Sequence, residues 1–444
     1  MRISKEKTLL GLAVAFIFLV IASATLLFSV RKDTPALDYR NTNTHHFPYE
    51  GKLTQASLVA GPFDVHRRYK SMEGPYVLCT FKVGDLIASK EVALPESLVS
   101  YDIKAGNLSM LGSNSKSTRI AARTNAEPRS LLWLKGVKLE VLDEENKVLP
   151  TAEFICHFNI EINRAFRAQI FPQSEWCTSP RLITISQGQT EEYFPEGFAV
   201  PAASDEEWNF AFQLANRTTD KHRRLKHRCT LYFVKDSDLT QPITALNWYT
   251  PYVYVAADPN FQDASHKDAC LSCFGMTAGV NAPNNILSLP KDDQGLTISP
   301  HWIVPPGVHT YTTHLAGWIM PGFSEKPRTI HAVWSHVHPF CTSLALYKCN
   351  DKTRQKIFSN SVETKTSPGL EIKSIEYLSS KQGISTGEVS QPHYVLETTY
   401  SNTSGVAQDA MASVGIFCAD GIFVKPEWAQ HASSPPSSLV ATKQ

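Results

Sequence analysis

An uncharged apolar segment near the N-terminus limits where the rest of this chain can fold. Residues 8–30 contain no charged side chain, and about 20 such residues are enough for a helix to cross the hydrocarbon core of a bilayer. Three basic residues, at positions 2, 5 and 7, precede the segment and favour a cytoplasmic N-terminus. We therefore expect residues 8–30 to be a transmembrane signal anchor that makes the chain a single-pass membrane protein.

A cleaved signal peptide is the alternative, because Ala22-Ser23-Ala24 is similar to a cleavage site. In both cases the body of the protein leaves the cytoplasm. We expect it in a bacterial periplasm, in a secretory lumen or at the cell surface, and in the anchored case the membrane is its first partner.

The length and charge of the chain narrow the classes of protein that it can belong to. It has 444 residues and a net charge of +1, so we expect two or three domains and no nucleic-acid partner. The 27 prolines outnumber the 22 glycines, and proline interrupts helices. This composition predicts many loops and few long helices.

The body of the chain alternates apolar and polar residues in short runs, which indicates an all-β fold. The clearest run is 154–162. One face would carry Phe154, Cys156, Phe158, Ile160 and Ile162, and the other His157, Asn159 and Glu161. We expect an additional β module over 48–130, one β-sandwich over 131–260, a second over 286–425, and a disordered tail over 429–444.

The cysteines give no pairing pattern. There are nine, so at least one is unpaired, although disulfides suit the expected compartment. Cys270 and Cys273 form a C-x-x-C pair that is compatible with a redox pair, half of a metal site or a tight disulfide loop. The Asn-X-Ser/Thr sequons at Asn107, Asn216 and Asn402 matter only in a eukaryotic lumen.

Two histidines and a methionine form the sharpest chemical pattern. In an extended segment residues i and i+2 point the same way, so His336 and His338 of Trp334-Ser-His-Val-His-Pro-Phe340 would converge on one face. Taken alone, they are equally compatible with surface or core histidines, and Met411 alone would be core filler. Together, two imidazoles and a thioether suit copper, notably Cu(I).

Residues 303–421 resemble the C-terminal domain of the copper type II, ascorbate-dependent monooxygenases, the family of peptidylglycine α-hydroxylating monooxygenase and dopamine β-hydroxylase. The matching elements, in the family's order, are Val304-Pro-Pro-Gly307, the H-x-H segment, residues 394–402 and Asp409-Ala-Met411. The resemblance implies tandem jelly-roll-like β-sandwiches. It also implies that His336, His338 and Met411 hold the copper that reacts with oxygen, with ascorbate or another reductant as electron donor.

The N-terminal half matches this family less well. The family's second copper, which relays electrons, uses an adjacent His-His pair and a third histidine further along the chain. Here the pair is Cys156-His157, and the third position falls near 213–215, where there is no histidine. The resemblance therefore leaves His157 as one remaining ligand and Cys156 as a substitute ligand, a disulfide half or a core thiol.

We expect O₂-dependent hydroxylation of a C–H bond in a small-molecule or peptide substrate. Two other hypotheses remain open. The sandwiches could be a non-catalytic module held at the membrane for a protein partner, or a copper storage or delivery protein, for which one His/His/Met site is enough. His301, His309, His314 and His331 lie in the same region of the sequence, and each either supports a metal ligand through a hydrogen bond or is a packing or surface residue.

Overall fold

The computed structural model describes most of the chain beyond residue 50. The described residues are 51–68, 74–99, 129–174, 179–217, 222–256, 291–315, 317, 319–320, 322–350, 353–366, 370–387, 393–419 and 421–430. The expected anchor at 8–30 lies outside these residues. Within the described ranges, no helix is both long and apolar enough to span a membrane.

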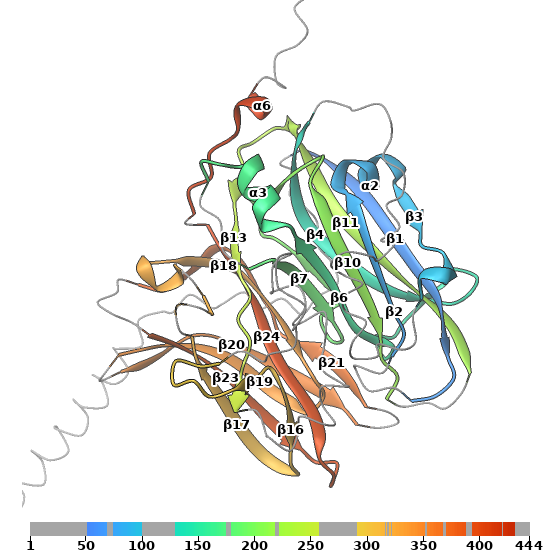
Figure 1. Ribbon diagram of the computed structural model, residues 1–444, viewed down its shortest axis with the longest axis vertical. Helices are drawn as coiled ribbons and strands as arrows, with labels where there is room; N and C mark the ends of the chain where they lie inside the picture. The colour runs from blue at the N-terminus through green and yellow to red at the C-terminus, as the bar shows by residue number, and fades with distance from the viewer. Residues whose placement is uncertain are drawn as a thin grey trace, which may run out of the picture. The chain divides into compact units, whose positions relative to one another are not determined.

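The first half of the described chain forms two facing β-sheets (Figure 1). The larger sheet contains β1 (Gly51–Val65), β3 (Glu91–Ala93), β4 (Leu131–Leu142), β5 (Val148–Leu149), β8 (Glu191–Tyr193), β9 (Phe198–Ala203), β11 (Arg223–Leu239) and β12 (Thr244–Ala245). The smaller sheet has the order β2 (Tyr76–Lys82), β10 (Glu207–Leu214), β6 (Ile155–Ile162) and β7 (Arg181–Ser186). Trp208 of β10 meets Phe233 of β11 across the two sheets, with ring centres 5.9 Å apart. Short helices connect the strands: α2 (Val83–Ser89), η1 (Glu96–Leu98) and α3 (Arg164–Ile170).

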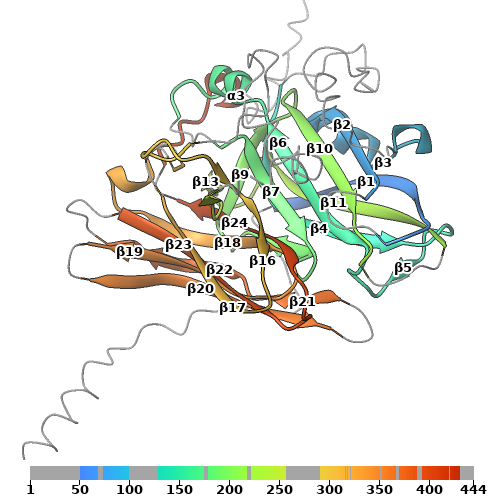
Figure 2. The same ribbon diagram turned by 60° about the horizontal axis from the view of Figure 1, so that its bottom comes forward.

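The second half forms another pair of sheets (Figure 2). One has the order β13 (Asn247–Tyr249), β24 (Gln408–Cys418), β18 (Thr329–Val337) and β22 (Leu378–Ser385), with β16 (His301–Val304) also on β24. The other has the order β17 (Gly307–His314), β23 (His393–Asn402), β19 (Cys341–Cys349), β20 (Arg354–Lys365) and β21 (Glu371–Ile375). β14 (Val255–Ala256) pairs with β15 (Ile298–Ser299), and η4 (Phe323–Glu325) and α6 (Glu427–Gln430) complete the described elements. The all-β sandwich prediction is therefore confirmed.

Strand pairing changes the division of the chain that we expected for residues 48–130. β1 pairs with β11 over most of its length, for example Leu58 with Cys229, and β2 pairs with β10. The described strands of this segment therefore complete the first sandwich instead of forming an additional module. Residues 48–50, 69–73 and 100–128 of this segment lie outside the described part.

The C-terminal segment returns to the first sandwich. Phe423 packs edge-on against Trp133 at 5.4 Å, and Trp428 of α6 packs near Phe171 at 6.1 Å. Ala429 is 1% exposed within this cluster. The predicted disordered tail is therefore wrong for residues 429–430, which end α6, where Ala429 adds an apolar contact to the core. Residues 431–444 lie outside the described part.

The two sandwiches pack against each other, and both sheets of the first one contribute: His157 of β6 meets His336, and Phe198 of β9 stacks on His331. Phe194 of the first stacks on Trp334 of β18 with ring centres 4.7 Å apart. The turn between β7 and β8 adds backbone contacts: the Ile375 amide donates to the Gly188 carbonyl at 3.0 Å, and the Ser335 amide donates to Gln189 Oε1 at 2.7 Å. Strand β6 is buried on both faces for this reason, since one faces its own core and the other the second sandwich.

The described cysteines are thiols. Cys79, Cys156, Cys229, Cys341, Cys349 and Cys418 are all buried and free. The disulfide prediction therefore finds no support among the described residues. Cys177, Cys270 and Cys273 lie outside them.

Candidate functional site

Strand register brings the three predicted copper ligands to one face of a sheet. His336 lies opposite Ser413 in the β18–β24 pair, and the His338 amide continues the ladder by donating to the Met411 carbonyl at 3.2 Å. Directly opposite residues of antiparallel strands point to the same side, with Cβ atoms about 4.5–5.5 Å apart. His336, His338 and Met411 therefore share the outer face of this sheet, toward the first sandwich.

Four imidazoles follow one another along this face. The ring centres of His336 and His338 are 5.6 Å apart, and those of His301 and His338 are 5.8 Å apart. His157 of the first sandwich meets His336 with ring centres 5.7 Å apart. His157, His336 and His338 are all buried, so the row lies where the two sandwiches meet.

A carboxylate supports one of these rings. Oδ2 of Asp409 lies 2.9 Å from Nδ1 of His338, at ion-pair distance. Burial acts to raise the pKa of Asp409, but the hydrogen bond and charge of His338 outweigh it, so the pKa of this carboxyl lies below its ordinary value. Burial lowers the pKa of His338 from its ordinary value in spite of Asp409. The Asp409 carboxylate lies on the Nδ1 side of His338, which leaves Nε2 on the opposite edge of the ring for a metal.

The donor types fit Cu(I), but the donor atoms are not gathered around one point. No group of three His, Cys, Asp or Glu side chains in the described part of the chain could hold a metal ion as the side chains stand. Met411 is 1% exposed and packs with Tyr252 and Tyr254. Metal binding would therefore require side-chain rotation, while the strands already place the ligand backbones side by side.

The first sandwich does not rebuild the family's electron-transfer site. His157 lies opposite Gln213 of β10, at the position where the resemblance places a third histidine. Cys156 is a bulge residue of β6, because His157 pairs with Gln213 and Ile155 pairs with Leu214, and its Sγ lies 3.2 Å from Nδ1 of His157. The structure therefore places a glutamine amide, not an imidazole, beside His157.

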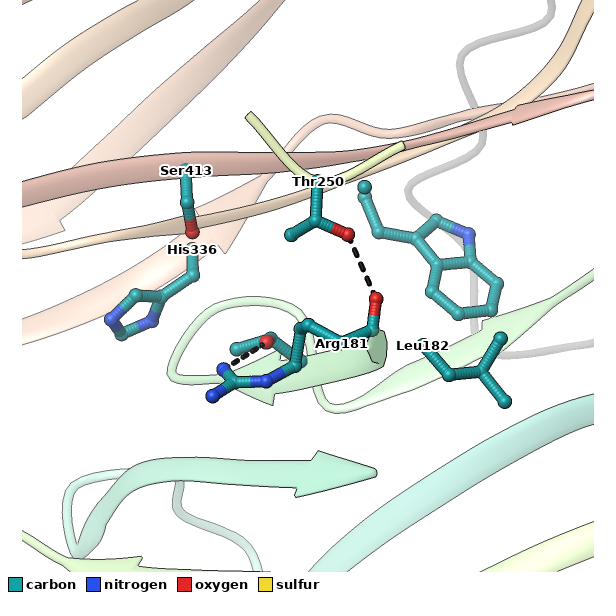
Figure 3. A pocket seen from close by; sticks show the side chains of 8 residues that line it. Arg181, Leu182, Thr250, His336 and Ser413 are labelled. Atoms are coloured by element: carbon teal, nitrogen blue, oxygen red, sulfur yellow. Dashed lines mark hydrogen bonds between the residues drawn. The ribbon is translucent and has the colours of Figure 1, made fainter. Parts of the chain in front are cut away.

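A small pocket lies beside His336 where the sandwiches meet (Figure 3). Its empty space is about 250 Å³ with the open mouth included, and the enclosed part has room for about one water molecule. The residues that line it are Arg181, Leu182, Thr184, Thr250, Trp334, His336, Ser413 and Gly415. Thr250 Oγ1 donates to the Arg181 carbonyl at 2.9 Å, and Arg181 Nη1 donates to Thr184 Oγ1 at 3.1 Å. The enclosed part of the pocket is too small for an organic substrate.

Sequence reasoning missed two neighbours of the predicted ligands. Asp409 stands two residues before Met411, and this spacing in a strand already places it on the same sheet face as Met411. His301 was grouped with other nearby histidines, and only the β16–β24 register places it opposite Met411. Tyr400 is a core residue whose hydroxyl donates to the Met411 carbonyl at 2.6 Å.

Comparison with known proteins assigns no family. No protein-family model and no curated protein matches the sequence. Solved structures that resemble it weakly include infectious bursal virus-derived T=1 particles (TM-score 0.16, 8% identity, covering 85% of this chain and 72% of that one). Another is a variant oxalate decarboxylase of B. subtilis (TM-score 0.12, 8% identity, covering 67% and 68%). At these scores the likenesses carry no argument about fold or function.

Proposed function

We propose that this chain is a membrane-anchored, copper-binding protein of the type II monooxygenase-like kind, with one copper held by His336, His338 and Met411. The observation that carries the proposal is the strand register, which puts two imidazoles and a thioether on one buried sheet face. Soft thioether and imidazole ligands select Cu(I), whereas zinc sites rarely use methionine.

The chain's own residues would prepare the site in three ways. Asp409 lies 2.9 Å from Nδ1 of His338, where its negative charge would raise the basicity of the ring as a ligand. The Tyr400 hydroxyl binds the backbone of Met411 and so fixes the strand that carries the thioether. The first sandwich covers the face and keeps bulk water away. Bound copper would supply the redox chemistry with O₂ by which the family hydroxylates C–H bonds.

A second candidate is a copper-binding protein without turnover, which acts in storage, delivery or attachment of a protein partner. Two observations favour it. Gln213 stands where the electron-transfer site would need a histidine, and the enclosed part of the pocket beside His336 holds about one water molecule. Without a second redox centre, another donor would have to supply the second electron of a hydroxylation.

Copper stoichiometry of the detergent-solubilised full chain tests the proposal. The protein is loaded with Cu(I) under ascorbate, desalted and analysed for metal. We expect one copper per chain, lost in His336→Ala and in Met411→Leu but retained in His309→Ala, whose ring Nε2 lies 3.2 Å from the Pro306 carbonyl oxygen. Absence of copper from the folded wild-type chain refutes the proposal.

Oxygen consumption then separates the two candidates. Ascorbate-dependent uptake of O₂ that disappears in Met411→Leu supports the monooxygenase. Firmly bound copper without O₂ uptake supports storage, delivery or a silent module.

The anchor at 8–30 is part of the same proposal. We expect the chain to remain in membranes during alkaline extraction and to become soluble when residues 1–32 are deleted. An undeleted chain released by alkali, with its N-terminus intact, contradicts the anchor.

A further inference from the structure

His301 lies closer to the proposed copper ligands than its place in the sequence indicates. It opens β16, directly opposite Met411 of β24, and therefore points to the same sheet face. His338 adjoins Met411 on the other side through the backbone hydrogen bond at 3.2 Å. One row across three neighbouring strands thus carries an imidazole, a thioether and a second imidazole.

The side chain of His301 has a buried nitrogen that the protein does not satisfy. Nε2 of His301 is inaccessible and has no hydrogen-bond partner among the described residues. A buried polar atom without a partner is costly, by about 1–3 kcal/mol, and in native structures it commonly marks an ion or a water site. This nitrogen is an independent indication that a ligand belongs beside Met411.

The spacing of the rings agrees with a shared metal. A nitrogen–metal bond of about 2 Å places the centre of an imidazole about 3 Å from the metal, so two rings on one tetrahedral ion have centres about 5 Å apart. The observed separations are 5.8 Å for His301 and His338 and 5.6 Å for His336 and His338. Side-chain rotation on the existing strands would have to bring the nitrogens together, because no three such side chains of the described residues could hold a metal ion as they stand.

We propose that His301 is a fourth protein ligand to the copper held by His336, His338 and Met411. The inference rests on the proposed copper site and adds what that site can do. A site with four protein ligands is coordinatively closed, whereas a catalytic site keeps a position open for substrate or oxygen. His301 therefore favours a copper-holding protein over an oxygenase.

Carbon monoxide tests this inference, because it binds Cu(I) only at an open coordination position and its stretching band reports the bond. The Cu(I)-loaded full chain is exposed to CO and examined by infrared spectroscopy beside His301→Ala, His301→Gln and the control His309→Ala. Copper content and the circular dichroism spectrum are measured on every sample. X-ray absorption then counts the imidazole ligands.

We expect copper-loaded wild type and His309→Ala to show no CO band, and His301→Ala to gain one with about one fewer imidazole around copper. Loss of copper from both His301 variants with the fold retained also supports a ligand role. A CO band of equal strength in wild type and His301→Ala overturns the inference while the copper site itself stands. Failure of the folded wild type to bind copper overturns the proposed function and this inference with it.

Discussion

The ion pair between Arg167 and Glu206 gives the sharpest test of what holds the first sandwich together. Arg167 of α3 and Glu206 before β10 are 1% and 0% exposed, and Nη1 lies 2.7 Å from Oε1. Arg167 also donates to the Pro201 carbonyl and lies over the ring of Trp248, 5.0 Å from its centre. Each charge is stabilised by the other, because neither side chain is exposed to water.

Removal of one partner leaves the other charge buried without its counter-ion, which costs about 3–5 kcal/mol. Arg167→Met loses in addition the contact with Trp248, worth about 0.5–2 kcal/mol. We therefore expect the free energy of unfolding to fall by about 4–5 kcal/mol in Arg167→Met and by about 3 kcal/mol in Glu206→Gln. The double variant leaves no buried charge, so it should cost well below the sum, by at least about 2 kcal/mol.

Urea unfolding followed by tryptophan fluorescence measures the four proteins of this cycle. The exposed pair Lys373–Glu363, at 2.9 Å, is the matched control: Lys373→Met should change stability by less than about 1 kcal/mol. The reasoning is refuted if the two buried substitutions are additive, or if each costs no more than the control.

Three further predictions concern single positions. Burial lowers the pKa of His227 to about 4 from an ordinary 6.5. As the pH falls from 6.5 toward 4, the unfolded chain takes up a proton that the folded chain does not, and the free energy of unfolding drops by about 3 kcal/mol. The urea midpoint of His227→Leu should lose this part of its dependence on pH, and a pH dependence equal to that of the wild type contradicts the prediction. Gly188→Ala should cost about 2–4 kcal/mol, because φ is +79° and the new Cβ would lie 2.5 Å from Cγ2 of Ile372, whereas Gly405→Ala, with φ +74° and open space, should cost only the backbone part in the same assay. Asn402→Ala should cost about 2 kcal/mol, since Nδ2 donates to the carbonyls of Val304 and Val406 at 2.9 and 2.7 Å, and mass spectrometry of protein made in eukaryotic cells should find no glycan on this buried side chain.

Sequence patterns predicted the local structure well because alternation is a local property. The two faces of residues 157–162 came out as expected: Phe158 packs on Phe212 inside the core with ring centres 4.7 Å apart, while His157 faces the second sandwich. The alternation stops at Cys156, where a register shift places Ile155 opposite Leu214. The H-x-H spacing placed His336 and His338 on one face for the same reason.

Long-range pairing could not be read from the sequence. β1 joins β11, a strand far along the chain, and no local pattern distinguishes that partner from a strand of a separate module. His301 lies opposite Met411 because of the β16–β24 register. A slip of that register by one residue would turn the His301 side chain to the other face of the sheet. Helix α6 is stabilised by contacts of Trp428 with Phe171 and with the Ile170 carbonyl. Composition alone does not predict these contacts.

The route of the chain has a consequence for proteolysis. It builds the first sandwich, crosses to the second, and then returns, so that the Val424 amide donates to Ser174 Oγ at 3.0 Å and Lys425 pairs with Asp236. A single protease cut between residues 256 and 291 would therefore not release two independent pieces. The C-terminal fragment would remain bound to the N-terminal one. The cleaved protein should therefore elute as one species in size-exclusion chromatography and separate into two fragments only in denaturant.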